Sequence, residues 1–482
     1  MVSGMSIDHA PYLSTLSRRG LVGLAAVAAG TTLLPGPRAT AAGVAVRTGD
    51  PFVEWLDRHA TPVRTSPRGP LDDLTPLRRT VRDAAVVGLG ESAHGTHTQF
   101  ALKHRVARYL VEELGFRTIA WEESWGSGVV LDRYVRGDGT DARTAVGQAP
   151  FRLRSQAMLD LVRWMREFNR GRPDWDLVRF LGADVLELRA LQYDEIERFA
   201  AAVVPDRLPR VRELLGALAL RGTPQEHLVW YKYRLTEDER QPLVAAAREL
   251  HEMVRDAAAS RAARRRRAAV DPDDAVLHAF ALLGFYESGS AAGVRDDLRD
   301  RYVAGVVTAW HERTGHRIVY SAANAHVAAA ERMVIEFPPD PPARRRLAGG
   351  LLRAGFGAGY VAVGTVFDHG DVLTGWEVDG GPRVYTVPPS SPSFADALLG
   401  RARLGDYLID LRRGGPAEVR ERLDGPASLR IMSSAYDSAR DEHYAQHLPS
   451  WRAGFDALLH VRTVTATQLV QAAGGRSRRR RG

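Results

Sequence analysis

The residue types best suited to proton transfer lie in the segment Glu91-Ser92-Ala93-His94, which has a glycine on either side. An imidazole exchanges protons near neutral pH, and a carboxylate three residues away can orient it or raise its basicity. The sequence therefore predicts that His94 is a general base that activates water and that Glu91 supports it. Ser92 as a nucleophile is the alternative, but the Gly-x-Ser-x-Gly pattern that presents such a serine is missing.

His94 and His97 are three residues apart, a spacing that also raises the possibility of a metal site. The other ligands of such a site would be Glu91, Glu122, Asp184 and His326. The spacing falls in a predicted turn rather than on a helix, and no His-Glu-x-x-His signature occurs. We therefore predict a reaction without a metal or another cofactor.

Four short apolar strands run directly into polar residues. The polar residues are Glu91 after 84–87, Glu122 after 118–121, Asp184 after 177–183, and Asn324 with His326 after 317–323. Helical segments separate the strands, which is typical of an α/β fold with a mostly parallel central sheet flanked by helices. Because the carboxyl ends of parallel strands meet at one edge, we expect these residues to share a cleft. Glu123 should point away from it, since neighbours on a strand face opposite sides.

Further residues near the strand ends are predicted to contact the substrate. Lys103 lies nine residues after His94, on a helix predicted over 100–114, in a chain whose cations are otherwise almost all arginine. It could pair with a strand-end carboxylate, or it could be a surface lysine with a buried stem. The predicted substrate contacts are Lys103, His97, Asp184, Trp125 and Asn324.

The rest of the chain divides into segments with distinct patterns. Residues 43–186 and 303–465 carry the strands of the predicted core, whereas 187–302 are predicted to form a helical cap over the strand ends. The Pro-rich stretch 337–342 is predicted to be a connector, and 376–379 a strand. The core is thus expected to be interrupted once, by the cap.

Residues 1–42 have the features of an export signal. Arg18 and Arg19 precede a weakly apolar Ala/Gly-rich run, and small residues end at Ala42. This pattern favours a twin-arginine signal, with a general secretory signal or a retained anchor as alternatives. The run is shorter than the roughly 20 residues that span a membrane, so we expect an exported protein without stable membrane insertion.

The net charge of +8 comes mainly from the ends of the chain, which are the leader and a Gly/Ser/Arg-rich tail at 466–482. We expect this tail to be disordered. The body between the two ends is nearly neutral, which argues against a nucleic-acid-binding surface. The absence of cysteine excludes disulfides, thiolate metal ligands and a cysteine nucleophile. We expect a small-molecule substrate, and the sequence leaves the oligomeric state open.

Taken together, these motifs resemble the erythromycin esterase family. The matching segments, in order, are 88–95, 109–116, 121–125, 164–169, 299–302 and 322–327. The resemblance implies an α/β core under a helical cap, a deep cleft between them, and metal-independent hydrolysis of a macrolide lactone. It implies further that His94 is the base, that Glu91 supports it, and that Glu122 is the strand-end carboxylate. His326 matches the second histidine of the family's Ala-His-Asn-x-His segment.

Three departures from the family pattern bear on the reaction. Ala323 stands where the family has the first histidine of that segment, Thr98 where it has a glutamate, and Lys103 where an arginine is usual. The methyl group of Ala323 can neither move a proton nor stabilise an oxyanion. The leading hypothesis is a secreted hydrolase of an ester or lactone, from a macrolide-like or other secondary metabolite. A non-hydrolytic tailoring enzyme (a cyclase, lyase or acyl-transfer catalyst) and a protein that sequesters a ligand without catalysis stay open.

Overall fold

Two β-sheets and the helices around them make up the described part of the chain. The computed structural model describes residues 49–139, 141–149, 153–267, 269–295, 297–375, 381–433 and 435–470. The predicted export signal at 1–42 and the predicted strand at 376–379 lie outside these residues.

The larger sheet positions the residues of interest. Its strands, in spatial order, are β1 (Thr61–Pro62), β10 (Tyr407–Asp410), β13 (Ala457–Val464), β8 (Tyr360–Thr374), β2 (Val86–Glu91), β5 (Ile318–Ala323), β3 (Thr118–Ser124) and β4 (Arg179–Asp184), and β9 (Arg383–Val387) pairs with β8. The strands from β13 to β4 are parallel, and β1, β10 and β9 pair antiparallel. The prediction of a mostly parallel central sheet is confirmed.

The pairing register brings the polar strand ends together. Glu91 lies opposite Ala323, and Ser124 lies opposite Asp184. Because β2, β5, β3 and β4 are neighbours, the four predicted strand ends meet at one edge of the sheet, as expected. Gly90 permits this close approach, since a Cβ atom there would lie 2.1 Å from Oδ1 of Asn324.

Helices cover both faces of this sheet. They are α1 (Pro51–His59), α2 (Arg78–Val81), α3 (His97–Leu114), α4 (Trp125–Arg136), α5 (Ala142–Gly147), α6 (Gln156–Asn169), α15 (Asn324–Val327), α16 (Ala348–Phe356), α17 (Ala395–Leu399), α18 (Ala417–Asp424) and α19 (Trp451–Gly454). Alternate residues of β2 enter two cores: Val87 packs with α3 and α6, and Val86 packs in the core that includes α16 and the cap. No helix in the described part is long and apolar enough to cross a membrane.

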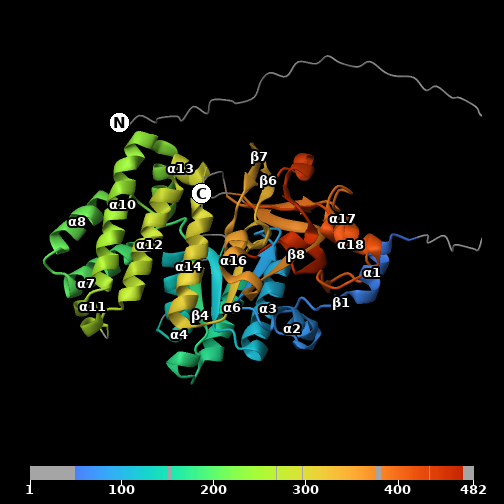
Figure 1. The fold of residues 1–482 in the computed structure, drawn as a ribbon, viewed down its shortest axis with the longest axis horizontal. Coiled ribbons are helices and arrows are strands. Elements are labelled where there is room, and N and C mark those ends of the chain that lie inside the picture. The colour runs from blue at the N-terminus through green and yellow to red at the C-terminus, as the bar shows by residue number, and fades with distance from the viewer. Residues whose placement is uncertain are drawn as a thin grey trace, which may run out of the picture. The chain divides into compact units, whose positions relative to one another are not determined.

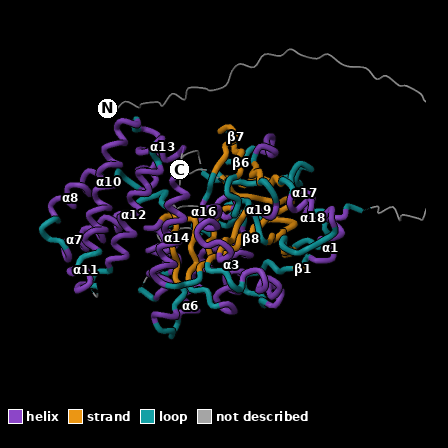
Figure 2. Tube along the Cα trace, in the orientation of Figure 1, coloured by secondary structure: helices purple, strands orange, loops and turns teal. Residues whose placement is uncertain are grey.

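The chain between β4 and β5 forms the cap, and its described residues hold helices and no strand (Figure 2). The helices are α7 (Ala190–Val203), α8 (Leu208–Ala217), α9 (Pro224–Val229), α10 (Glu237–Ala258), α11 (Arg261–Arg266), α12 (Pro272–Ser288), α13 (Ala291–Arg295) and α14 (Leu298–Thr314). Figure 1 shows α14 between α12 and the strands, where it contacts both α12 and β4. It therefore runs from the segment predicted as cap into the segment predicted as core.

A second, antiparallel sheet was not predicted. It contains β11 (Ala427–Arg430), β12 (Ala445–Leu448), β6 (Met333–Phe337) and β7 (Asp340–Arg345) in that order. The stretch 337–342, predicted to be a connector, is part of the β6–β7 hairpin instead. Proline is tolerated in β7 because it is an edge strand, so proline content alone misled the prediction.

The first residues of the tail that was predicted to be disordered are held against the core. Ala466 pairs with Thr96, Leu469 pairs with Ser155, and the Val470 N–H donates to the carbonyl of Arg154 at 2.7 Å. These backbone contacts fix residues 466–470 against the core, which corrects the prediction for that part. The rest of the tail, 471–482, lies outside the described residues.

Candidate active site

A cavity of about 660 Å³ lies over the meeting strand ends. The core contributes Glu91, Ser92, His94, Glu122, Ala323 and His326 to its wall, and the cap and the β6–β7 hairpin contribute Leu228, Lys232, Tyr233, Arg299, Asp300, Ile335 and Phe337. The strand ends form its floor and cap residues contribute to its walls, as predicted for a cap over the strand ends. We call this cavity the catalytic cleft.

His94 is held by Glu91 in an orientation that leaves one ring nitrogen for a substrate or water. Its Nδ1 lies 2.9 Å from Oε1 of Glu91, and its side chain is 17% exposed. A carboxylate can only accept, so Nδ1 donates to Glu91 and Nε2 is the ring nitrogen that faces away from this bond. The predicted pairing of Glu91 with His94 is therefore present.

Lys103 lies behind Glu91 rather than in the cleft. Its ammonium pairs with Oε2 of Glu91, lies 4.8 Å from the ring centroid of Trp121, and its side chain is 1% exposed. Burial would raise the pKa of Glu91, but Lys103 and His94 outweigh it and hold that pKa below its usual value. Lys103 was predicted to contact the substrate; instead it positions Glu91, because helix α3 directs it into the protein.

Glu122 anchors the opposite wall of the cleft. Its Oε2 accepts the N–H of Ala323 at 2.8 Å, and its Oε1 accepts from Nη2 of Arg299 at 3.0 Å. Arg299 also donates through Nε to Oδ1 of Asp184 at 3.0 Å. Asp184, predicted to contact the substrate, is buried and does not line the cleft; it is used to hold Arg299. Glu123 does not line the cleft either, as expected from strand alternation.

His326 forms a second histidine–carboxylate pair. Its Nδ1 lies 2.6 Å from Oδ1 of Asp300, and its Nε2 lies 3.5 Å from Oε1 of Glu122. Burial would lower the pKa of His326, but Asp300 and Glu122 outweigh it and raise that pKa to about 9. At neutral pH the cleft thus contains an imidazolium, His326, on the wall that also carries Glu122.

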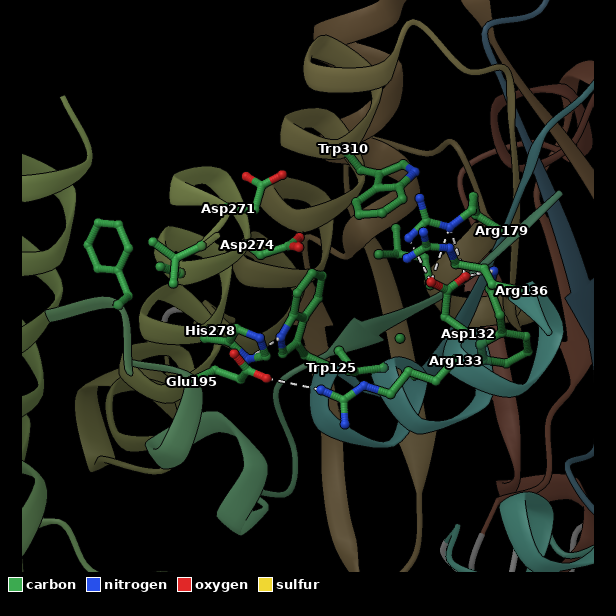
Figure 3. A pocket seen from close by; sticks show the side chains of 18 of the residues that line it. Trp125, Asp132, Arg133, Arg136, Arg179, Glu195, Asp271, Asp274, His278 and Trp310 are labelled. Atoms are coloured by element: carbon green, nitrogen blue, oxygen red, sulfur yellow. Dashed lines mark hydrogen bonds and ion pairs between the residues drawn. The ribbon is translucent and has the colours of Figure 1, made fainter. Parts of the chain in front are cut away.

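Three predicted substrate contacts lie elsewhere. Trp125 lines a separate cavity of about 210 Å³, where its indole N–H donates to Nδ1 of His278 at 2.9 Å (Figure 3). The Asn324 side chain is buried and bonds to the backbone of Thr365. His97 opens helix α3 and does not line the cleft. Adjacency in sequence to a strand end did not reveal the direction of these side chains.

The sequence reasoning missed Arg299 and Asp300, at the start of α14. Arg299 meets Asp184 across 115 positions of sequence, so no local spacing could have linked them. In the sequence, these two residues were noted only because the segment 299–302 resembles the family, and that resemblance assigned them no role. Lys232 and Tyr233 of the cap carried no motif at all.

The side chains of Glu91, His94 and Glu122 could also hold a cation, because donor atoms of all three lie within 4.8 Å of one another. In the structure, however, both carboxylates are already paired with cations of the protein, Lys103 and Arg299. This pairing suits an acid–base site. That the reaction needs no metal stays a prediction.

Comparison with known proteins gives the chain a family context. Residues 111–464 match the family model described as erythromycin esterase. The chain is 32% identical to erythromycin esterase type II of Escherichia coli over 135 residues, which cover 28% of this chain and 32% of that protein. It is 37% identical to the putative hydrolase YbfO of Bacillus subtilis (strain 168) over 71 residues, 15% of this chain and 16% of that one. These alignments thus span a third or less of either relative.

Solved structures share the fold. A Bacillus cereus protein superposes with a TM-score of 0.75 at 24% identity, covering 87% of this chain and 98% of that one. A succinoglycan biosynthesis protein gives 0.73 at 21% identity, covering 89% and 100%. A mutant of erythromycin esterase EreC in its open conformation gives 0.65 at 17% identity, covering 86% and 99%. Because the superpositions cover 98–100% of the solved chains, these proteins share the fold of this chain over nearly their whole length.

Proposed function

The chain belongs to the erythromycin esterase family, a family of hydrolases, and on that premise we propose that it hydrolyses an ester or lactone of a macrolide-like or other small metabolite. The observation that carries this proposal is the pairing of His94 with Glu91 at 2.9 Å at the floor of a cleft of about 660 Å³. A substrate carbonyl placed in that cleft would meet a water molecule bound to His94.

His94 supplies the base in this proposal. Its Nε2 takes a proton from water while the oxygen attacks the carbonyl carbon, and Glu91 stabilises the imidazolium that forms. Lys103 holds Glu91 in place throughout. General-base catalysis of this kind contributes roughly 10²–10⁴-fold to a rate.

The opposite wall supplies positive charge. Attack on the carbonyl places a negative charge on its oxygen, and cations fixed in advance stabilise that charge. His326 as an imidazolium and the guanidinium of Arg299, both held by Glu122, are the candidates. His326 can also give its proton to the departing alkoxide, and transfer of the proton held by His94 back to His326, directly or through water, then restores the site.

A non-hydrolytic reaction on the same scaffold is the second candidate, and Ala323 favours it. Ala323 lines the cleft beside Glu122, so a methyl group stands where the resemblance to the family implies an imidazole. A site with one histidine fewer on this wall could catalyse a cyclisation, an elimination or an acyl transfer in place of hydrolysis.

Incubation with a panel of macrolides and linear esters, followed by mass spectrometry, separates these functions. Hydrolysis adds one water to the substrate mass, whereas cyclisation or isomerisation leaves it unchanged. His94→Ala should abolish product formation and leave the fold intact. Tight binding without any product, unaffected by His94→Asn, would instead indicate a ligand-sequestering protein.

We also propose export through a twin-arginine signal in residues 1–42, on the strength of Arg18 and Arg19. Replacing both with lysine should leave the protein in the cytoplasm in a cell-fractionation experiment. Unchanged export of that variant would exclude this route.

A further inference from the structure

The catalytic cleft contains a cation that the proposed reaction does not use, Lys232 of the cap. The chain has 66 lysine and arginine residues, of which only Lys103 and Lys232 are lysine. Lys103 is buried against Glu91, whereas Lys232 is partly buried and lines the cleft together with Arg299. Both lysines therefore lie at the catalytic cleft, one behind its floor and one on its cap side.

A π-helical turn, Trp230–Arg234, carries Lys232 over the cleft. The guanidinium of Arg240 donates to the carbonyls of Tyr231, Lys232 and Leu235 at 3.0, 2.5 and 2.8 Å. The hydroxyl of Tyr231 donates to the carbonyl of Tyr286 on α12 at 2.5 Å. Turns of this kind are rare and frequently occur at functional sites. Because this one is held by side-chain bonds to neighbouring elements, the backbone of Lys232 is fixed before a substrate arrives.

The ammonium of Lys232 has no hydrogen bond or ion pair with any residue that the structure describes. The neighbouring acidic side chains are already paired: Glu91 with Lys103, Glu122 and Asp184 with Arg299, Asp297 with Arg345, and Asp300 with His326. Asp340 also lines the cleft but is exposed on β7 and forms no ion pair with Lys232. Burial, and then repulsion from Arg299, lower the pKa of Lys232. A ligand that brings an acceptor to this charge would offset the cost of its partial burial.

We propose that Lys232 binds a carboxylate of the substrate, so that the enzyme prefers esters that carry a negative charge away from the ester group. This inference rests on the proposed hydrolase function and narrows its substrate class. One free ammonium matches the single charge of a carboxylate better than the nearly two charges of a phosphate monoester. Arg299 is already paired with Asp184 and Glu122 and faces the carbonyl oxygen in the proposed reaction, so the second negative charge of the substrate is assigned to Lys232. A cationic substrate would meet repulsion at this position.

The first test compares two esters that differ only in charge. The substrates are the 4-nitrophenyl half-esters of glutarate and adipate and their neutral carboxamide counterparts, assayed with the wild type and with Lys232→Gln. The matched control is Arg234→Gln, which removes an exposed charge from the same turn outside the cleft.

The wild type should show a higher kcat/KM for the acid than for the carboxamide, mainly through KM. In Lys232→Gln the ratio of the two kcat/KM values should fall roughly 10- to 100-fold, the usual effect of one hydrogen bond between charged groups. Arg234→Gln should keep the wild-type ratio. An unchanged ratio in Lys232→Gln, or the same ratio change in Arg234→Gln, overturns the inference.

A second test does not depend on catalysis. Lys103 is buried, so an acetylating reagent should modify Lys232 first, and peptide mass spectrometry separates it from the N-terminal amine. The ligands are 5-oxohexanoate, a ketone with a terminal carboxylate, and its neutral amide, 5-oxohexanamide. The carboxylate should slow acetylation of Lys232 in both the wild type and His94→Ala, and the amide should not.

Equal protection by the two ligands, or none by either, contradicts the assignment of Lys232. If the wild type hydrolyses no ester while 5-oxohexanoate still protects Lys232, the hydrolase proposal fails and the carboxylate site stands. The two failures can therefore be told apart.

Discussion

Oε1 of Glu91 accepts the Nδ1–H of His94 at 2.9 Å, while its other oxygen is paired with the buried ammonium of Lys103. The carboxylate is thus fixed from behind by one cation and orients the imidazole in front of it. This chain of three residues, which begins on α3 and ends at the cleft, makes His94 a base with a defined free nitrogen.

Replacing Lys103 with methionine should destabilise the fold. The substitution leaves the carboxylate of Glu91 buried without its cation, and breaking one side of a buried ion pair costs about 3–5 kcal/mol. Urea denaturation gives the loss in the free energy of unfolding. The double variant with Glu91→Gln should lose less than the sum of the single changes, because no unpaired charge remains. Strict additivity would show that the pair does not act as a unit.

His326 should make stability depend on pH. Its pKa is raised to about 9 in the folded state, compared with about 6.5 in the unfolded chain. Its contribution is therefore complete below pH 6.5 and is lost as pH rises through 9, and amounts to roughly 2–4 kcal/mol. The difference in unfolding free energy between wild type and His326→Gln should shrink by this amount between pH 6 and pH 10.

Asp300→Asn provides the control for that measurement. An amide can still accept the hydrogen bond but has no charge, so the pKa of His326, followed by NMR titration, should fall in this variant. A pKa that does not move would mean that Asp300 is not the source of the shift.

Trp125→Phe distinguishes the two cavities. Trp125 lines the smaller cavity, and its indole N–H is used by His278. The substitution leaves Nδ1 of His278 buried without a donor, so stability should drop by about 1–3 kcal/mol, measured by urea denaturation. The kcat/KM for a hydrolysed ester should stay close to that of the wild type. A large rise in KM would instead indicate that Trp125 contacts the substrate in the catalytic cleft.

The sheet and its cleft edge could be predicted because their signals are local. An apolar run followed at once by Glu91, Glu122, Asp184 or Asn324 marks a strand end, and parallel pairing then brings such ends together. The alternation that turns Glu123 away from the cleft is local as well.

Other features depend on contacts between distant segments. The partnership of Arg299 with Asp184 joins α14 to β4, and no spacing links two positions so far apart. The direction of Trp125 depends on how α4 packs against α12 and α14, where His278 and Trp310 contact its indole. The β6–β7 hairpin was not predicted because proline usually interrupts strands. Its prolines are tolerated because β7 lies at the edge of the sheet.

The most direct test of the central claim is the ratio of kcat/KM between the wild type and His94→Gln, for an ester that the wild type hydrolyses. Glutamine retains an amide near the position of the imidazole but cannot take a proton from water. The variant should have a kcat/KM lower by roughly 10²–10⁴-fold, with an unchanged circular dichroism spectrum. A His94→Gln variant with a kcat/KM equal to that of the wild type would contradict the assignment of His94 as the base.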